Sequence, residues 1–167
     1  MSRCPHTFVF LCLVSLLSLA LGATVPDQEE ELFQNSCLMG WYDFNGRCYK
    51  YVASPVVWAN AESYCVSEGA NLASVHSESE QQFISTLIKS FDPAERPTWI
   101  GLSDVHMEGR WMWSDGSKVD FTKWHATQPN GGVTENCVTT HFSGPQWFDR
   151  DCNSNLYSFV CAKRLCK

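Results

Sequence analysis

Apolar residues recur at helical spacing in two stretches of the chain. The first stretch starts at Ser54-Pro55, ends at Gly69, and has its apolar positions at Val57, Trp58, Ala61, Tyr64 and Cys65. The second starts at Ser77, and Glu80 follows at the spacing of a capping box, in which each side chain satisfies an end donor. Its apolar face consists of Phe83, Ile84, Leu87 and Ile88. The pattern predicts two amphipathic helices.

Strand-like segments lie before and after these helices. Residues 41–44 and 47–51 flank Asn45-Gly46, a turn dipeptide that suits a tight hairpin. From residue 97 onward, short aromatic-rich segments alternate with turns, and we assign Trp99–Leu102 to a core strand whose glycine lets a neighbour approach closely. Helices first and strands later predict an α+β domain with segregated layers. Two further aromatic residues are assigned to the core, Trp111 and Trp113.

The first residues have the features of a secretory signal. Arg3 supplies the positive start, residues 8–20 are apolar, and small residues near Gly22 and Ala23 suit cleavage. The apolar run is shorter than the roughly 20 residues that a membrane-spanning helix needs. We therefore expect a secreted, extracellular protein without a membrane span. The predicted organisation is a signal peptide at 1–23, a short acidic segment at 24–36 and one domain at 37–167.

The cysteines indicate a disulfide framework. Two of the nine, Cys4 and Cys12, lie in the predicted signal. The seven that remain include no Cys-x-x-Cys pair, and in an exported chain their density is typical of disulfides rather than of a metal cluster. An odd number leaves one thiol free or available for an intermolecular bond.

Charge and motifs exclude several functional classes. The chain has a formal net charge of −6 and no basic run, which argues against nucleic acid and against anionic membranes as partners. Its histidines have no metal-ligand spacing, and no Gly-x-Ser-x-Gly elbow is present, so we predict neither a zinc site nor an enzyme.

Oxygen-bearing side chains are concentrated late in the chain. Gln128, Asn130 and Glu135 lie within eight positions, and Asp149 follows shortly before Cys152. Carboxylate and amide oxygens gathered from a loop are the ligands that a hard cation such as Ca²⁺ prefers. The sequence therefore predicts a calcium site.

Together with Trp99–Leu102 upstream, these segments occur in the order that C-type lectin domains use, and the chain resembles that family from about Cys37 to Cys166. In layout it is most similar to small secreted single-domain lectins of fish. The resemblance implies a C-type lectin-like fold with two helices, short antiparallel sheets and a long loop region that binds calcium and sugar. It also implies three disulfides, Cys37–Cys48, Cys65–Cys161 and Cys137–Cys152. Cys166 is then left over as a candidate for a disulfide-linked homodimer.

The resemblance further implies a function and its residues. One Ca²⁺ would be held by Gln128, Asn130, Glu135 and Asp149, and two hydroxyls of a hexose, on glycans or microbial surfaces, would complete its coordination. Family members that bind Ca²⁺ have a cis proline between the first two ligands, so we expect the Gln128–Pro129 bond to be cis. Trp124 is expected to support the loop from beneath.

Two features depart from the family pattern. Glu-Pro-Asn is the family's mannose-type triplet and Gln-Pro-Asp its galactose-type triplet, whereas this chain has Gln128-Pro129-Asn130, a hybrid. Phe148 stands where calcium-binding members have an asparagine ligand, so we expect weakened calcium binding, with the ring as a possible sugar contact. Gly131 and Asn136 stand where acidic ligands would help, so a second calcium site is not expected.

An alternative interpretation is a C-type lectin-like module that binds protein or ice and has no sugar site. Type II antifreeze proteins share the framework, including a similar Cys-x₁₀-Cys hairpin and the sequence style of residues 72–77. They carry additional cysteines in the loop region, and those are absent here. The leading hypothesis is therefore a calcium-dependent lectin for a galactose- or mannose-type hexose.

Overall fold

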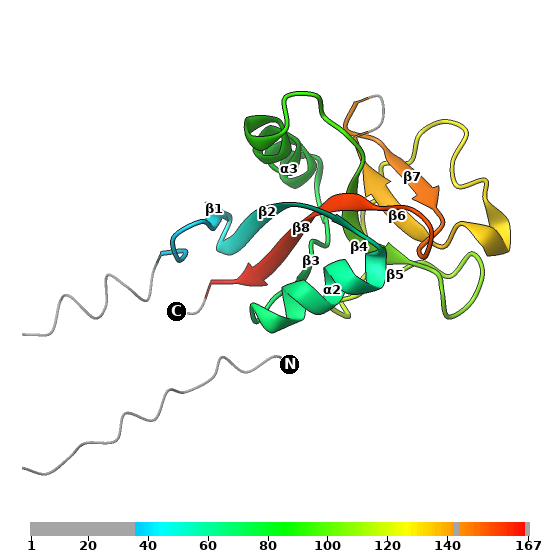
Figure 1. The fold of residues 1–167 in the computed structure, drawn as a ribbon, viewed down its shortest axis with the longest axis horizontal. Coiled ribbons are helices and arrows are strands. Elements are labelled where there is room, and N and C mark those ends of the chain that lie inside the picture. Colours follow the sequence, from blue (N-terminus) through cyan, green and yellow to red (C-terminus); the bar gives the residue numbers. More distant parts are fainter. Residues whose placement is uncertain (1–35, 142–143, 166–167) are drawn as a thin grey trace, which may run out of the picture. The chain divides into compact units, whose positions relative to one another are not determined.

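Two helices and an eight-stranded sheet make up the domain (Figure 1). A computed structural model describes residues 36–141 and 144–165, which contain one compact unit, Cys37–Leu165. The predicted signal peptide, nearly all of the acidic segment and Cys166 lie outside the described residues. No helix in the described ranges is long and apolar enough to cross a membrane.

The elements follow one another in an order that places the helices early. They are β1 (Tyr42–Phe44), β2 (Arg47–Val56), α2 (Trp58–Ser67), β3 (Asn71–Leu72), α3 (Glu78–Phe91), β4 (Thr98–Ser103), β5 (Met112–Trp113), the 3₁₀ helix η1 (Gly132–Thr134), β6 (Cys137–Thr140), β7 (Trp147–Arg150) and β8 (Tyr157–Arg164). The predicted α+β class and the hairpin at Asn45-Gly46 are confirmed.

The strands join one mixed sheet rather than separate antiparallel sheets. Its order is β1-β2-β8-β4-β6-β7, with β3 paired to β8 and β5 paired to β4. Pairing is antiparallel except between β4 and β8, where Trp99 lies beside Phe159. The predicted antiparallel pairs are therefore present, and one parallel pair joins them because the last strand returns along β2 and so runs in the direction of β4. Helices α2 and α3 lie on either side of the β2–β8 pair (Figure 1).

The first helix begins later than its sequence pattern predicted. Ser54 and Pro55 belong to β2, which continues to Val56 opposite Tyr157. The ladder shifts register between Val52 and Val56, and such an irregularity accommodates a proline, which has no N–H to donate. Tertiary pairing with β8 therefore extends the strand over a plausible helix start.

The second helix begins as predicted, with one difference in the cap. Ser77 Oγ accepts the N–H of Glu80 at 3.1 Å, whereas Glu80 Oε2 accepts the N–H of His76 at 2.6 Å. The other carboxylate oxygen of Glu80 accepts hydrogen bonds from Tyr49 and Arg47. This one carboxylate therefore caps α3 and also ties it to β2.

Strand β4 forms the centre of the core. Trp99, Ile100 and Leu102 are fully buried, and a Cβ at Gly101 would lie 2.6 Å from the carbonyl oxygen of Leu72. The close approach of the Leu72 backbone therefore requires a glycine at position 101, as the sequence indicated. Of the two tryptophans assigned to the core, Trp113 is buried, and Trp111 is partly buried and packs against the core cluster.

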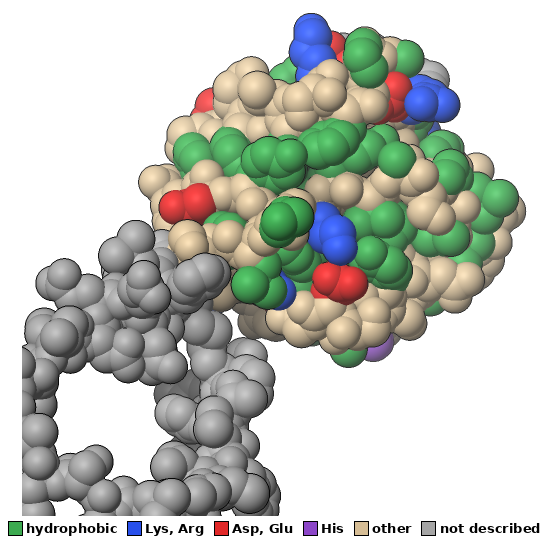
Figure 2. All heavy atoms as spheres, turned by 60° about the vertical axis from the view of Figure 1, so that its left-hand side comes forward, with side chains coloured by type: hydrophobic (Ala, Val, Ile, Leu, Met, Phe, Trp, Pro, Cys, Tyr) green, Lys and Arg blue, Asp and Glu red, His purple; other side chains and the backbone are tan. Residues whose placement is uncertain are grey.

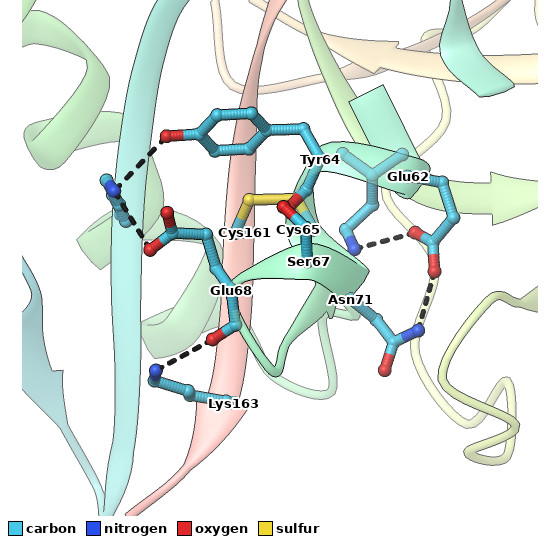
Figure 3. Close-up of a disulfide and its surroundings, with 10 residues drawn as sticks. Glu62, Tyr64, Cys65, Ser67, Glu68, Asn71, Cys161 and Lys163 are labelled. Atoms are coloured by element: carbon cyan, nitrogen blue, oxygen red, sulfur yellow. Dashed lines mark hydrogen bonds and ion pairs between the residues drawn. A yellow bond between two sulfur atoms is a disulfide. The ribbon is translucent and has the colours of Figure 1, made fainter. Parts of the chain in front are cut away.

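The three predicted disulfides are present. Cys37–Cys48 closes the first hairpin and Cys137–Cys152 joins β6 to the segment after β7. Cys65–Cys161 joins α2 to β8 and closes a separation of 96 residues (Figure 3). Beside this bridge, Lys163 Nζ donates to the carbonyl oxygen of Glu68 at 3.0 Å. A cross-link of this length reduces the entropy of the unfolded chain by a large amount and so stabilises the fold.

His141 is a buried imidazole at the edge of this core. It follows β6, is 1% exposed and has a left-handed φ of 64°. Its Nδ1 lies 3.3 Å from Glu95 Oε2, and Glu95 Oε1 pairs with Lys89 Nζ at 2.8 Å. Burial lowers the pKa of His141, and the Glu95 carboxylate opposes that shift. The unfolded chain therefore binds a proton at this residue more readily than the folded chain does.

This imbalance predicts sensitivity to acid. Because the folded pKa of His141 is depressed, its neutral form supports folding above the unfolded pKa, near 6.5, and stability is lost as the pH falls below that value. His141→Asn keeps a residue that tolerates positive φ and removes the titration. The free energy of unfolding, measured with urea, should fall less between pH 7.5 and pH 5 in the variant than in the parent. His106→Asn, which removes an exposed imidazole, is the control, and an unchanged loss in His141→Asn would contradict the assignment.

Candidate functional site

The loop that carries the candidate ligands begins against β7. The N–H of His125 donates to the Trp147 carbonyl at 3.0 Å, and the N–H of Trp147 donates to the Lys123 carbonyl at 2.8 Å. Trp124 is partly buried, and its ring meets those of Trp147 and Trp111 edge to face at 5.9 and 4.8 Å. Trp124 thus lies under the start of the loop, where the resemblance placed a supporting residue.

Asp149 joins this loop to the sheet. Its Oδ2 accepts the N–H groups of Asn130 at 2.9 Å and of Gly131 at 2.7 Å, although these residues are 19 and 18 positions away. The Gln128–Pro129 bond is cis, as expected, and the N–H of Gln128 donates to the His125 carbonyl at 2.9 Å. Hydrogen bonds from backbone N–H groups therefore hold Asn130 against the Asp149 carboxylate, and the cis bond and the contact with His125 fix Gln128 two residues before Asn130.

Glu135 completes the group from the far end of η1. A Cβ at Gly131 would lie 2.1 Å from the Cβ of Glu135 and 2.6 Å from its Oε2. The Glu135 side chain thus lies directly over Gly131, whose N–H donates to Asp149. Burial and the negative charge of Asp149 raise the pKa of Glu135, and the charge of Arg150 opposes this. Glu135 and Asp149 therefore both contact position 131, which only a residue without a side chain can occupy.

Two oxygens of this group have no hydrogen-bond partner. Gln128 Oε1 and Asp149 Oδ1 are both buried and unpaired within the described residues. A buried acceptor without a donor costs free energy, so folded proteins seldom keep one without a reason. Among the residues described, no three His, Cys, Asp or Glu side chains form a metal-holding group. The four candidate residues supply two carboxylates and two amides, and this donor set suits a hard cation rather than zinc.

Phe148 contributes no oxygen and little accessible ring. Its side chain is 5% exposed, with the His125 ring stacked on it at 4.9 Å and the Arg150 guanidinium 5.2 Å from its centroid. A ligand that approaches this flank of the loop meets the half-buried His125 before it meets Phe148. Sequence reasoning did not single out His125 as part of the site, and its place directly after the supporting tryptophan was the available signal.

Asp104 illustrates how a carboxylate near the loop is satisfied without a metal. The Asn136 side-chain amide donates to its Oδ1 at 2.9 Å, and the Gly109 N–H donates to its Oδ2 at 2.7 Å. Both oxygens of this buried residue therefore have donors, in contrast to Asp149.

Comparison with known proteins identifies the family. A family model described as the lectin C-type domain matches residues 54–163. The chain belongs to the C-type lectin family. Members of this family are not enzymes, so the prediction that the chain is not an enzyme is confirmed.

Proteins similar to this chain include both sugar-binding lectins and an antifreeze protein. The galactose-specific lectin nattectin of Thalassophryne nattereri is 40% identical over 99% of this chain and 100% of its own length. The lactose-binding lectin l-2 of Anguilla japonica is 39% identical over 93% of this chain and 94% of its own length. Herring type II antifreeze protein superposes with a TM-score of 0.72 at 38% identity and covers 77% of this chain and 99% of its own. The fold is thus shared across two different functions.

Proposed function

We propose that this C-type lectin binds a hexose through one Ca²⁺ held by Gln128, Asn130, Glu135 and Asp149. The proposal depends chiefly on the two buried, unpaired oxygens, Gln128 Oε1 and Asp149 Oδ1. A cation satisfies both of them and also relieves the repulsion between Asp149 and Glu135. The donor set fits calcium because its oxygens come from carboxylates and amides, the groups that a hard cation prefers.

Calcium binding by this set is expected to be weak. Two of the four residues are neutral, and Phe148 adds no oxygen because its ring is packed against His125. Extracellular calcium modules operate with dissociation constants of about 10⁻⁴ to 10⁻³ M. The site therefore fits a protein that works where calcium is abundant.

Galactose is the hexose that we place first. The amides of Gln128 and Asn130 donate hydrogen bonds, whereas the carboxylates of Glu135 and Asp149 only accept them, so the pattern can recognise a pair of sugar hydroxyls. The triplet is a hybrid of the two family types, but the two fish relatives are named for galactose and lactose. Phe148 contributes indirectly, by supporting the His125 ring at the edge of the site.

The chain is proposed to act outside the cell. Three disulfides are present in the described domain, which suits an oxidising compartment. Residues 1–23 are proposed as the signal peptide, 24–36 as a short leader and 37–167 as the lectin domain. Its partners are then hexoses on glycans or microbial surfaces.

Calcium should stabilise the folded chain by mass action. For a dissociation constant of about 1 mM, about 10 mM calcium adds about 1.4 kcal/mol of stability. This should raise the thermal midpoint by about 4 °C for a domain of this size. Glu135→Gln should abolish the rise, because it removes one of two ligand charges. In chelator, its thermal midpoint should be no lower than that of the parent. Asp43→Asn, which removes an exposed charge on β1, is the control; an unchanged parent midpoint in calcium would contradict the proposal.

Sugar binding is tested by chromatography on immobilised galactose and mannose. The chain should be retained on galactose in about 10 mM calcium and released by chelator, because the sugar hydroxyls bind through the ion. Retention that survives chelation would contradict a calcium-dependent site. No retention on either resin would favour the protein- or ice-binding alternative that the antifreeze relative represents.

A disulfide-linked homodimer is proposed from the end of the chain. The N–H of Leu165, the residue before Cys166, donates to the Gly46 carbonyl at 2.9 Å, so β8 is held at the first hairpin up to this point. Exposed apolar side chains lie on that hairpin and near it, among them Tyr42 and Phe91, whose rings are 5.8 Å apart. Figure 2 shows a band of hydrophobic side chains on this side of the molecule. A second copy could cover such a surface and present two sugar sites, which increases avidity.

Electrophoresis without reductant tests this dimer. The secreted protein should migrate at twice the monomer mass and collapse to monomer on reduction. Cys166→Ser should give the monomer without reductant and keep the calcium-dependent rise in the thermal midpoint, because the three internal disulfides are untouched. A single monomer band from the unreduced parent would rule the dimer out.

A further inference from the structure

A groove of about 540 Å³ lies beside the candidate calcium site, and none of the four candidate ligands lines it. The Cys137–Cys152 disulfide and the start of α2 contribute to its lining, together with η1, the segment after β4 and the segment after β7. The residues that line it are Trp58, Ala59, Val105, Val133, Thr134, Asn136, Cys137, Asp151, Cys152 and Asn153. Its volume lies in the range of small-molecule sites in proteins.

The lining of this groove is held in place by hydrogen bonds. The N–H of Trp58 donates to the Cys152 carbonyl at 3.2 Å, and its indole Nε1 donates to the Ile100 carbonyl at 2.9 Å. Asp151 Oδ1 accepts the N–H of Asn153 at 2.8 Å. The groove therefore exists before any ligand arrives, which limits the entropy lost on binding.

The chemistry of the lining combines apolar surface with groups that bind hydroxyls. Val105 and Val133 are 51% and 78% exposed, which is high for side chains of this kind. The Thr134 hydroxyl donates to the Gly131 carbonyl at 2.7 Å and can still accept. The Asn136 amide donates one of its two protons to Asp104 Oδ1 at 2.9 Å, and the Asn153 side chain offers a second amide. A neutral pyranose ring has the matching properties, since it presents apolar C–H faces and a rim of hydroxyls. The Asp151 carboxylate disfavours an acidic sugar.

One segment separates this groove from the candidate calcium site. Thr134 and Asn136 line the groove, and Glu135 between them has extended backbone, with φ −125° and ψ 92°. Side chains that follow one another in extended backbone point to opposite sides. The Glu135 side chain lies over Gly131, whereas Thr134 and Asn136 line the groove, and the Thr134 hydroxyl also donates to the Gly131 carbonyl. Adjacent Cα atoms are about 3.8 Å apart, so a single glycan can contact both sides.

We infer that this groove is a second subsite, which takes a neutral sugar unit of the same glycan whose terminal hexose occupies the calcium site. The inference rests on the proposed function and adds that the natural ligand is an oligosaccharide. Val133 lies on the intervening segment and Val105 on the segment after β4, and both line the groove, so the two valines together provide the apolar contact.

Calorimetry with two probes in about 10 mM calcium tests the subsite. Methyl β-galactoside reports the calcium site alone, and a neutral galactose-terminated tetrasaccharide reports both. The parent should bind the tetrasaccharide about tenfold more tightly, a change that corresponds to about 1.4 kcal/mol. The double variant Val105→Ala/Val133→Ala should bind both probes equally, with its affinity for methyl β-galactoside unchanged. Both valines are exposed, so their truncation should not prevent folding.

Val66→Ala is the matched control, since Val66 is an exposed valine on α2 outside the groove, at 55% exposure. It should keep the tenfold preference. Equal binding of the two probes by the parent overturns the subsite and leaves the lectin function standing. A preference that survives in the double variant also overturns it. A parent that binds neither probe overturns the proposed function itself, and the subsite with it.

Discussion

The Asp149 carboxylate is the contact on which the functional end of this molecule depends. Its Oδ2 accepts two consecutive backbone N–H groups, those of Asn130 and Gly131, and so attaches an irregular loop to strand β7. Two residues earlier, the backbone of Trp147 holds the start of the same loop through Lys123 and His125. A short strand thus positions a long segment without adding another strand, because hydrogen bonds to a carboxylate are stronger than those between neutral groups.

This arrangement leaves part of the site unfavourable in the absence of a ligand. Within the described residues, the second oxygen of Asp149 is buried without a donor, and Glu135 lies near enough for the charge of Asp149 to help raise its pKa. Both effects reduce the stability of the metal-free fold. The buried β4 core and three disulfides offset that cost and keep the loop in place. Such a balance is expected of a binding site, because the groups that a ligand will satisfy cannot also be satisfied within the protein.

The segment from Val133 to Cys137 serves two surfaces. Glu135 belongs to the candidate calcium site, whereas its neighbours Thr134 and Asn136 line the groove, as do Val133 and Cys137. The disulfide from Cys137 to Cys152 fixes the end of this segment and also lines the groove.

The sequence alone determined the class of fold, the cap of α3, the hairpin turn and the core role of Trp99–Leu102, because these depend on local spacing and on short-range chemistry. The resemblance supplied the disulfide pairing and the four candidate oxygens. Tertiary structure decided the rest. It extended β2 across Ser54-Pro55 because pairing with β8 outweighed a weak helix start, and it made the sheet mixed because the last strand returned along β2. It also buried Phe148 under His125, left two oxygens without donors and formed the groove, since each of these brings together residues that are distant in the sequence.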